Sequence, residues 1–285
     1  MSSPDRDASA ESAPQSDTPR PRAHCTAEGD GAISVRIATP TTTATTPPRL
    51  LLRLRPPKGR PEQTRLVFDL EPAAATPGHW QTTVAADPAL EEGRWDAYLL
   101  TTADDDARQR LLPGVRDLRT LVAGRTPGTS PSPLAVRIPY ATLDGYLALR
   151  TWLRPAHAEA DRVQVTDTAM TVQGRLYGAE LDAGAVALLR RRGKDGTVRE
   201  TELTAQDTHT FSFTAAYQDL LEAPGVWDVF VRPSTDAPLI RTARLLDDIA
   251  DRKKVFVYPS TPLGALTARP YYTVDNDLAV EITTA

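Results

Sequence analysis

The sequence predicts an all-β protein: two tandem antiparallel β-sandwiches of immunoglobulin-like character, a disordered N-terminal tail and an extra C-terminal strand. Two motifs occur twice at nearly the same spacing, which indicates a duplicated module. Apolar and polar residues alternate in many short runs separated by Gly, Pro and Asp, as in half-buried strands. No run has the pattern of a helix longer than about two turns, so sandwiches of short strands are favoured.

The duplication rests on two unrelated motifs. The stretches 93–98 (GRWDAY) and 225–230 (GVWDVF) match, and Trp95 and Trp227 lie 132 residues apart (227 minus 95). The stretches 139–148 (PYATLDGYLA) and 270–279 (PYYTVDNDLA) also match, and their prolines lie 131 residues apart (270 minus 139). A period of this length is the size of a small domain.

Composition divides the chain into five parts. Residues 1–28 contain almost no large apolar side chain and predict a disordered tail. Residues 123–136 have the Gly, Pro, Ser and Thr content of a linker between the repeats. We therefore predict a first sandwich at 29–122, a second at 137–260, and a C-terminal extension at 261–285.

The elements follow from alternation and turn residues. Residues 191–197 contain a Gly and an Asp-Gly pair between two strand-like runs and predict a hairpin turn. Residues 215–221 predict a short helix before the second Trp-Asp strand. The strand-like runs lie at 33–37, 50–54, 147–153, 162–166, 208–213 and 252–258.

The Gly-x-Trp-Asp strand is expected at the centre of each sandwich. We expect Trp95, with Tyr98 or Leu99, to fill the core between the sheets of the first module. Trp227, with Phe230, is expected to do the same in the second.

The Pro-Tyr motif is predicted to open the second module. Its copy at 270–282 then resembles the first strand of a third module, of which no other strand follows in the sequence. An unpaired strand is an aggregation hazard. We expect it either to fold back onto the second sandwich or to add to the edge of a partner.

Charge and composition exclude several classes of function. The net charge is −4 and Lys and Arg are spread along both halves, which argues against nucleic-acid binding. Cys25 is the only cysteine, so no disulfide can form within the chain. No secretory signal or apolar run of membrane-spanning length is recognisable. We expect a cytoplasmic protein with no integral membrane segment, which reaches a membrane only through a partner.

No motif of a metal or cofactor site stands out. The four histidines lie far apart in sequence, and Cys25 falls in the predicted tail, where a rigid catalytic pocket is not expected. Nucleotide-binding, zinc-protease and nucleophile-elbow motifs do not occur. We predict no metal, no cofactor and no catalytic residue.

Two sets of residues are candidates for binding. Asp96 and Asp228 follow the tryptophans and should face away from the core, where duplicated acids could bind a cation or a sugar, or anchor a neighbouring turn. The second set is aromatic and lies near the module ends, where stacking on a sugar competes with core or strand-edge packing. It comprises Tyr140, Tyr146, Trp152, Tyr271 and Tyr272.

The repeated motifs resemble accessory β-sandwich domains of actinobacterial proteins, which accompany glycosyltransferases and CDP-glycerol-type glycerophosphotransferases of cell-wall glycopolymer synthesis. The resemblance covers about residues 30–282 and concerns the appended domains, not a catalytic domain. It implies a non-catalytic module that acts with a transferase in docking, spacing or carbohydrate binding. Its partner would be the transferase or a carbohydrate polymer.

Two other hypotheses stay open. One is a small transferase whose site lies between the two sandwiches, where Asp96 and Asp228 would converge for acid-base work. The other is a structural partner that uses the terminal strand for β-augmentation.

Overall fold

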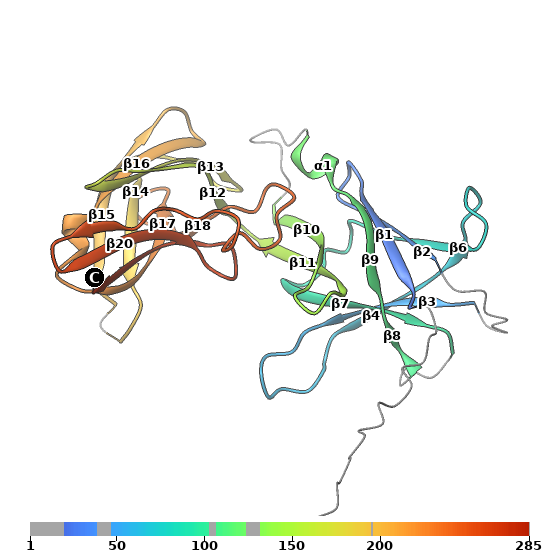
Figure 1. The fold of residues 1–285 in the computed structure, drawn as a ribbon. Coiled ribbons are helices and arrows are strands. Elements are labelled where there is room, and N and C mark those ends of the chain that lie inside the picture. Colours follow the sequence, from blue (N-terminus) through green and yellow to red (C-terminus); the bar gives the residue numbers. More distant parts are fainter. Residues whose placement is uncertain (1–19, 39–46, 103–106, 124–131, 195, 285) are drawn as a thin grey trace, which may run out of the picture.

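The computed structural model describes residues 20–38, 47–102, 107–123, 132–194 and 196–284 (Figure 1). These residues form twenty-one strands, one short helix, α1 (Arg119–Val122), and one 3-10 helix, Tyr217–Leu220. The all-β prediction is confirmed, and the 3-10 helix falls where the short helix was expected. No helix in these ranges is long and apolar enough to cross a membrane.

The N-terminal half contains two sheets that enclose one core. The five-stranded sheet has the order β5 (Glu71–Pro72), β6 (His79–Val84), β2 (Ile33–Ala38), β1 (Arg22–Ala27), β9 (Leu112–Asp117). The six-stranded sheet has the order β10 (Leu134–Ala141), β11 (Leu147–Arg154), β7 (Gly93–Leu100), β3 (Arg49–Leu54), β4 (Arg65–Asp69), with β8 (Gln109–Arg110) paired to β7. Alternate residues of β2 and β3 meet Trp95 between the sheets.

The C-terminal half is one ten-stranded sheet that curls back on itself. Its order is β14 (Val186–Arg191), β15 (Val198–Ala205), β16 (Thr210–Ala216), β13 (Ala169–Tyr177), β12 (His157–Val165), β18 (Ile240–Ala243), β17 (Gly225–Arg232), β21 (Leu278–Thr284), β20 (Leu266–Tyr272), β19 (Thr261–Leu263). Because β14 also pairs with β17, the first seven strands of this order close into a barrel-like ring around Trp227. This half thus differs from the two separate sheets of a sandwich.

The two copies of each motif occupy equivalent places in the strand register. In the first half Leu149 of β11 lies opposite Trp95, and in the second half Val280 of β21 lies opposite Trp227. The Pro-Tyr hairpin, β10–β11 or β20–β21, therefore follows each Trp-Asp strand and pairs with it. Each repeat ends with this hairpin, whereas the sequence analysis placed it at the start.

This pairing corrects the predicted start of the second module and shows where the C-terminal strand lies. The second sandwich was predicted to begin at residue 137, directly after the linker predicted at 123–136, but residues 134–154 belong to the sheet of the first half. We propose a division near residue 155 instead. The expected orphan strand is paired on both sides, because β21 lies between β17 and β20 in the same chain. The strand therefore folds back onto its own chain, which is one of the two outcomes expected for it.

Two local predictions were also wrong. Disorder was predicted up to residue 28, yet β1 is a strand between β2 and β9, with Ala23, Cys25 and Ala27 buried. Small side chains are enough on the buried face of β1, because the larger buried side chains of β2 fill the core beside it. Residues 1–19 and 124–131, which carry most of the predicted tail and linker, lie outside the described ranges. The strand expected at 252–258 is a turn-containing segment.

Candidate functional site

The Trp-Asp-x-aromatic strand has an inner and an outer face in both repeats. Trp95 and Trp227 are almost fully buried, and each indole N–H donates to the carbonyl oxygen four residues earlier, of Glu91 at 3.0 Å and Ala223 at 3.2 Å. Leu99 shares the core with Trp95, as predicted. Phe230 does not pack with Trp227, because strand alternation turns it to the outer face.

Asp96 lies on that outer face and binds arginines from both neighbouring strands. Its carboxylate is 2.8 Å from Nη2 of Arg53 and 2.6 Å from Nη2 of Arg55, and Arg110 is 3.6 Å away. Asp96 is only 2% exposed. The bond to Asp96 raises the pKa of Arg55 above its ordinary value, as expected for a charge-assisted pair.

Asp228 repeats this arrangement. Nη2 of Arg192 lies 2.7 Å from its Oδ1, and Nη1 of Arg241 lies 3.5 Å from its Oδ2. Bonding to Asp228 raises the pKa of Arg192. The described partners of the duplicated acids are thus guanidinium groups, and they differ from the backbone groups of a turn that the sequence suggested.

The aromatic residue two positions after each acid is covered by guanidinium groups. Tyr98 has Arg53 at 5.4 Å and Arg108 at 5.2 Å from its ring centroid. In the second repeat the ring of Phe230 has Arg190 at 4.7 Å and Arg241 at 5.0 Å. Such contacts are cation–π interactions and leave little ring surface for a ligand.

Two of the five candidate aromatics are buried. Trp152 is 1% exposed and Tyr272 is fully buried, with its ring 5.8 Å from that of Phe256 and 6.2 Å from that of Tyr258. Burial raises the pKa of Tyr272 well above its ordinary value. The prediction that these two rings stack on a sugar is wrong, because neither has a face open to solvent.

The other three tyrosines are half-buried and do not form one site. Tyr146 lies under the guanidinium of Arg110, 3.9 Å from its ring centroid. Tyr140 borders a hollow of about 850 Å³ between β9, α1 and β10. Tyr271 lies in the other half, on β20, with Nζ of Lys253 6.0 Å from its ring.

A feature that the sequence analysis missed joins the two repeats. The turn at residues 273–277, here called the second turn, contacts four side chains at the edge of the first repeat. These four side chains, Arg94, Arg150, Trp152 and Arg154, are here called the corner. The alternation of Arg, Trp and Arg on β11 is the only sequence signal for it.

The corner donates hydrogen bonds to the second turn. The indole N–H of Trp152 donates to the carbonyl oxygen of Asp275 at 3.1 Å, and Nη2 of Arg150 lies 2.6 Å from Oδ1 of the same residue. Nη2 of Arg94 donates to the carbonyl oxygen of Val274 at 3.2 Å. The acceptor of the buried Trp152 indole N–H belongs to the second turn, so this donor is satisfied only when that turn is in place.

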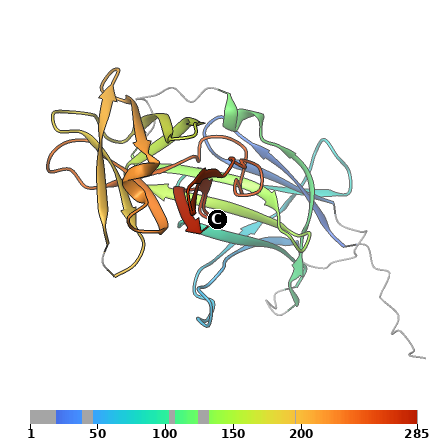
Figure 2. The same cartoon turned by 60° about the vertical axis from the view of Figure 1, so that its left-hand side comes forward.

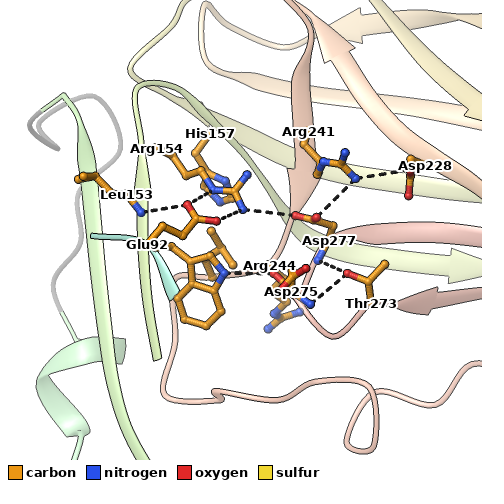
Figure 3. A network of polar contacts seen from close by, with 12 residues as sticks. Glu92, Leu153, Arg154, His157, Asp228, Arg241, Arg244, Thr273, Asp275 and Asp277 are labelled. Carbon is orange, nitrogen blue, oxygen red and sulfur yellow. Dashed lines mark hydrogen bonds and ion pairs between the residues drawn. The ribbon is translucent and has the colours of Figure 1, made fainter. Parts of the chain in front are cut away.

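Alternating charges continue from the corner into the second repeat (Figure 3). Glu92 accepts from Nη2 of Arg154 at 2.9 Å, and Asp277 lies 3.8 Å from Arg154 and 3.5 Å from Arg241. Arg241 then reaches Asp228. Burial raises the pKa of Asp277 to about 6, although both arginines oppose the rise.

The second turn is also fixed by contacts within the second half. Asn276 adopts a positive φ of 62° and is fully buried, and its Oδ1 accepts from the backbone N–H of Arg252 at 3.1 Å. Asparagine is one of the few side-chain-bearing residues that adopt this conformation readily. Tyr177, Ala243 and Leu245 of the second half complete the core of the first half. The joint is therefore both polar and apolar.

Within the described ranges, no three His, Cys, Asp or Glu side chains gather as metal ligands. Cys25 is buried, which raises its pKa to about 12. The outer faces of the two Trp-Asp strands and the joint thus contain paired arginines and acids that fix neighbouring elements.

Comparison with known proteins finds no matching family model and no matching curated protein. Nine chains of solved structures match. One is S. aureus TarS 217-571, with 16% identity and a TM-score of 0.37 over 45% of this chain and 38% of that chain. Another is S. aureus TarS, with 15% identity and a TM-score of 0.37 over 52% of this chain and 28% of that chain. A TM-score of this size assigns neither fold nor function.

Proposed function

We propose that the chain is a non-catalytic accessory module that acts with a cell-wall glycopolymer transferase, as a docking or spacing unit. The observation that carries the proposal is the joint between the repeats. Four donors of the corner meet one turn, and apolar residues of both halves share a core beside it. Such a joint suits a protein that holds two surfaces at a fixed separation.

The motif resemblance supplies the class of partner. The stretches 93–98 and 139–148, with their copies at 225–230 and 270–279, resemble accessory domains that accompany such transferases. We also propose a cytoplasmic location, with any membrane contact made through the transferase. It concerns the appended domains, so no catalytic residue is carried over.

The alternative of a small transferase would need Asp96 and Asp228 as an acid and a base in one site. Asp96 lies in the six-stranded sheet and Asp228 in the ten-stranded sheet. Each carboxylate contacts at least two arginines of its own half, so neither is aimed at a site that the two acids share. The contacts therefore favour the accessory role.

The proposal is tested by chemical cross-linking of the tagged full chain in its own cells, followed by identification of the captured proteins and glycans. We expect a wall-polymer transferase with the natural chain, and a weaker signal with D275R, which places a cation against the corner. The control is K253A, a change at an exposed side chain outside the joint. Turnover of a nucleotide-activated sugar or alcohol by the pure chain would contradict the proposal.

A further inference from the structure

The chain contains two turns of the same build. In residues 142–146, here called the first turn, the N–H of Thr142 donates to the carbonyl of Tyr146 at 2.9 Å, and the N–H of Tyr146 donates to Thr142 Oγ1 at 3.0 Å. In the second turn Thr273 and Asp277 make the same two bonds, at 2.8 and 3.2 Å. The repeats thus carry matching projections at the ends of matching hairpins.

Only the second turn is docked. Its Val274 and Asp275 meet the corner, as described above. In the first turn the equivalent residues are Leu143 and Asp144. Leu143 is 91% exposed, the highest value among the large apolar side chains of the described residues, whereas Val274 is 53% exposed. The first turn therefore presents a more exposed apolar side chain than its copy, in which the carbonyl oxygen of Val274 accepts from the corner.

The corner, by contrast, is not duplicated. The two copies of each motif lie 131 or 132 residues apart. At that spacing, three donor residues of the corner correspond to residues of different chemistry. Arg94, Arg150 and Trp152 correspond to Val226, Glu281 and Thr283. The described part of the chain thus holds two turns and one corner, and the corner is occupied by the second turn.

We propose that the first turn, residues 142–146, is a docking surface for a partner protein whose β-sheet ends in a corner like that of the first repeat. The partner presents an indole N–H beside arginine side chains. Asp144, Leu143 and the carbonyl groups of the turn take the parts that Asp275 and Val274 take in the joint. The inference goes beyond the proposed function, because it holds whichever partner the chain serves.

Charge favours this kind of partner. Thr142 and Arg110, through their hydrogen bonds, lower the pKa of Asp144 to about 2, so the carboxylate is ionised at neutral pH. Nη1 of Arg110 lies 2.5 Å from its Oδ2 and the side chain stays 57% exposed. Asp275 is equally exposed, at 54%, while it binds Arg150. A carboxylate held by one arginine can therefore accept from a second.

A second natural copy of this chain is not the partner, because its only corner is filled by its own second turn. A copy with an emptied corner is nevertheless the ideal probe. In D275R an arginine faces Arg150, so like charges displace the second turn. Asn276 and the strands of the hairpin are unchanged, which keeps the second half folded.

The experiment compares full-length natural protein, D275R and D144R/D275R by sedimentation velocity, at concentrations up to about 1 mM, the range of effective concentration for tethered contacts. Hydrogen exchange of residues 147–154 is followed in parallel. We expect D275R to associate head to tail as its concentration rises, with its corner becoming protected again. The natural chain and D144R/D275R should remain monomeric, and the double variant should have an unprotected corner throughout.

Three results would overturn the inference. The first is a D275R chain that stays monomeric with a corner as unprotected as that of D144R/D275R at every concentration. The second is equal association of D275R and the double variant, which would place the contact elsewhere. The third is a corner that stays protected in dilute D144R/D275R, because the corner would then not recognise the carboxylate that the two turns share.

Discussion

At the scale of single residues, the hydrogen bond of the Trp152 indole depends on the other repeat. Its indole is buried, its N–H donates to the carbonyl of Asp275, and the guanidinium of Arg150 lies 4.8 Å from its ring centroid. An aromatic side chain near a module end was predicted to contact a sugar. It instead fills the joint, because the second turn covers it.

Two substitutions of Trp152 separate its hydrogen bond from its packing. W152F keeps most of the ring contacts but loses the donor, so it should lower the free energy of unfolding by about 1 kcal/mol. W152A also leaves a cavity and should cost about 3–5 kcal/mol. Urea unfolding followed by circular dichroism measures both. Equal, small losses would show that the indole is not part of the joint.

Asp277 predicts a pH dependence. Its folded pKa of about 6 lies above the ordinary value of 3.8, so the folded state binds the proton more tightly than the unfolded state. Stability from this group is then fully present below about pH 4 and is lost as the pH rises through about 6. The charged groups around it are Arg154, Arg241, Asp228 and Asp275.

D277N removes this titration. The difference in unfolding free energy between natural protein and D277N should change by up to about 3 kcal/mol between pH 4 and 7, with the natural protein relatively more stable at the lower pH. The difference between the two proteins removes the contribution of every group that titrates equally in both. Urea unfolding at steps of half a pH unit measures it, and a difference that is constant over this range would contradict the account.

At the scale of elements, the Pro-Tyr hairpin completes each repeat. In the second half it contributes Ala268, Tyr272, Leu278, Val280 and Ile282 to the core around Trp227. A hairpin that supplies this much buried surface is part of the fold rather than an appendage.

Truncation tests this directly. A chain that ends at residue 265 should lose the folded second half, because the truncation removes those five buried side chains and uncovers the core around Trp227 and one edge of β17. The first half should keep its own sheets. Hydrogen exchange should therefore be fast throughout 157–243 and slow in β2 and β7, with a chain that ends at Thr283 as the control. Protection of β17 in the shorter chain would contradict the pairing.

The elements also show what sequence could and could not predict. Strand patterns such as 33–37 and 50–54, the hairpin turn near 191–197 and the central Trp-Asp strands follow from local alternation and turn residues, and they are present. A repeat gives the period of a duplication but not its starting point. Whether residues 139–148 open one module or close another depends on pairing with β7, which is distant in sequence.

The same limit applies to the candidate site. The outward direction of Asp96 and Asp228 follows from strand alternation, but their arginine partners come from other strands. Cys25 was placed in a disordered tail because its neighbours are small, yet β1 needs only small residues between β2 and β9. The composition of a segment indicates how much apolar surface its own side chains can bury. It does not indicate whether neighbouring strands supply the rest of the core.

At the scale of the whole molecule, the two halves lie side by side and meet at the C-terminal hairpin. Both views place the red C-terminal strands next to the green β10–β11 hairpin, in agreement with the bond between Trp152 and Asp275 (Figures 1 and 2). The joint determines how far apart the outer surfaces of the two repeats are. A docking or spacing role depends on that distance being fixed.

A distance measurement between the halves tests this central claim. Cys25 is buried and its pKa is raised to about 12, so it should not react with a thiol label. Cysteines introduced by V115C on β9 and V198C on β15 replace exposed valines, one in each half. Spin labels on this pair report the distribution of separations by pulsed dipolar spectroscopy.

The account predicts one narrow distribution in the V115C/V198C protein and a broad one when D275R is added. The matched control is L143R, which changes the first turn and should leave the distribution narrow. A broad distribution without D275R, or a narrow one that D275R does not change, would contradict a joint held by the second turn and the corner.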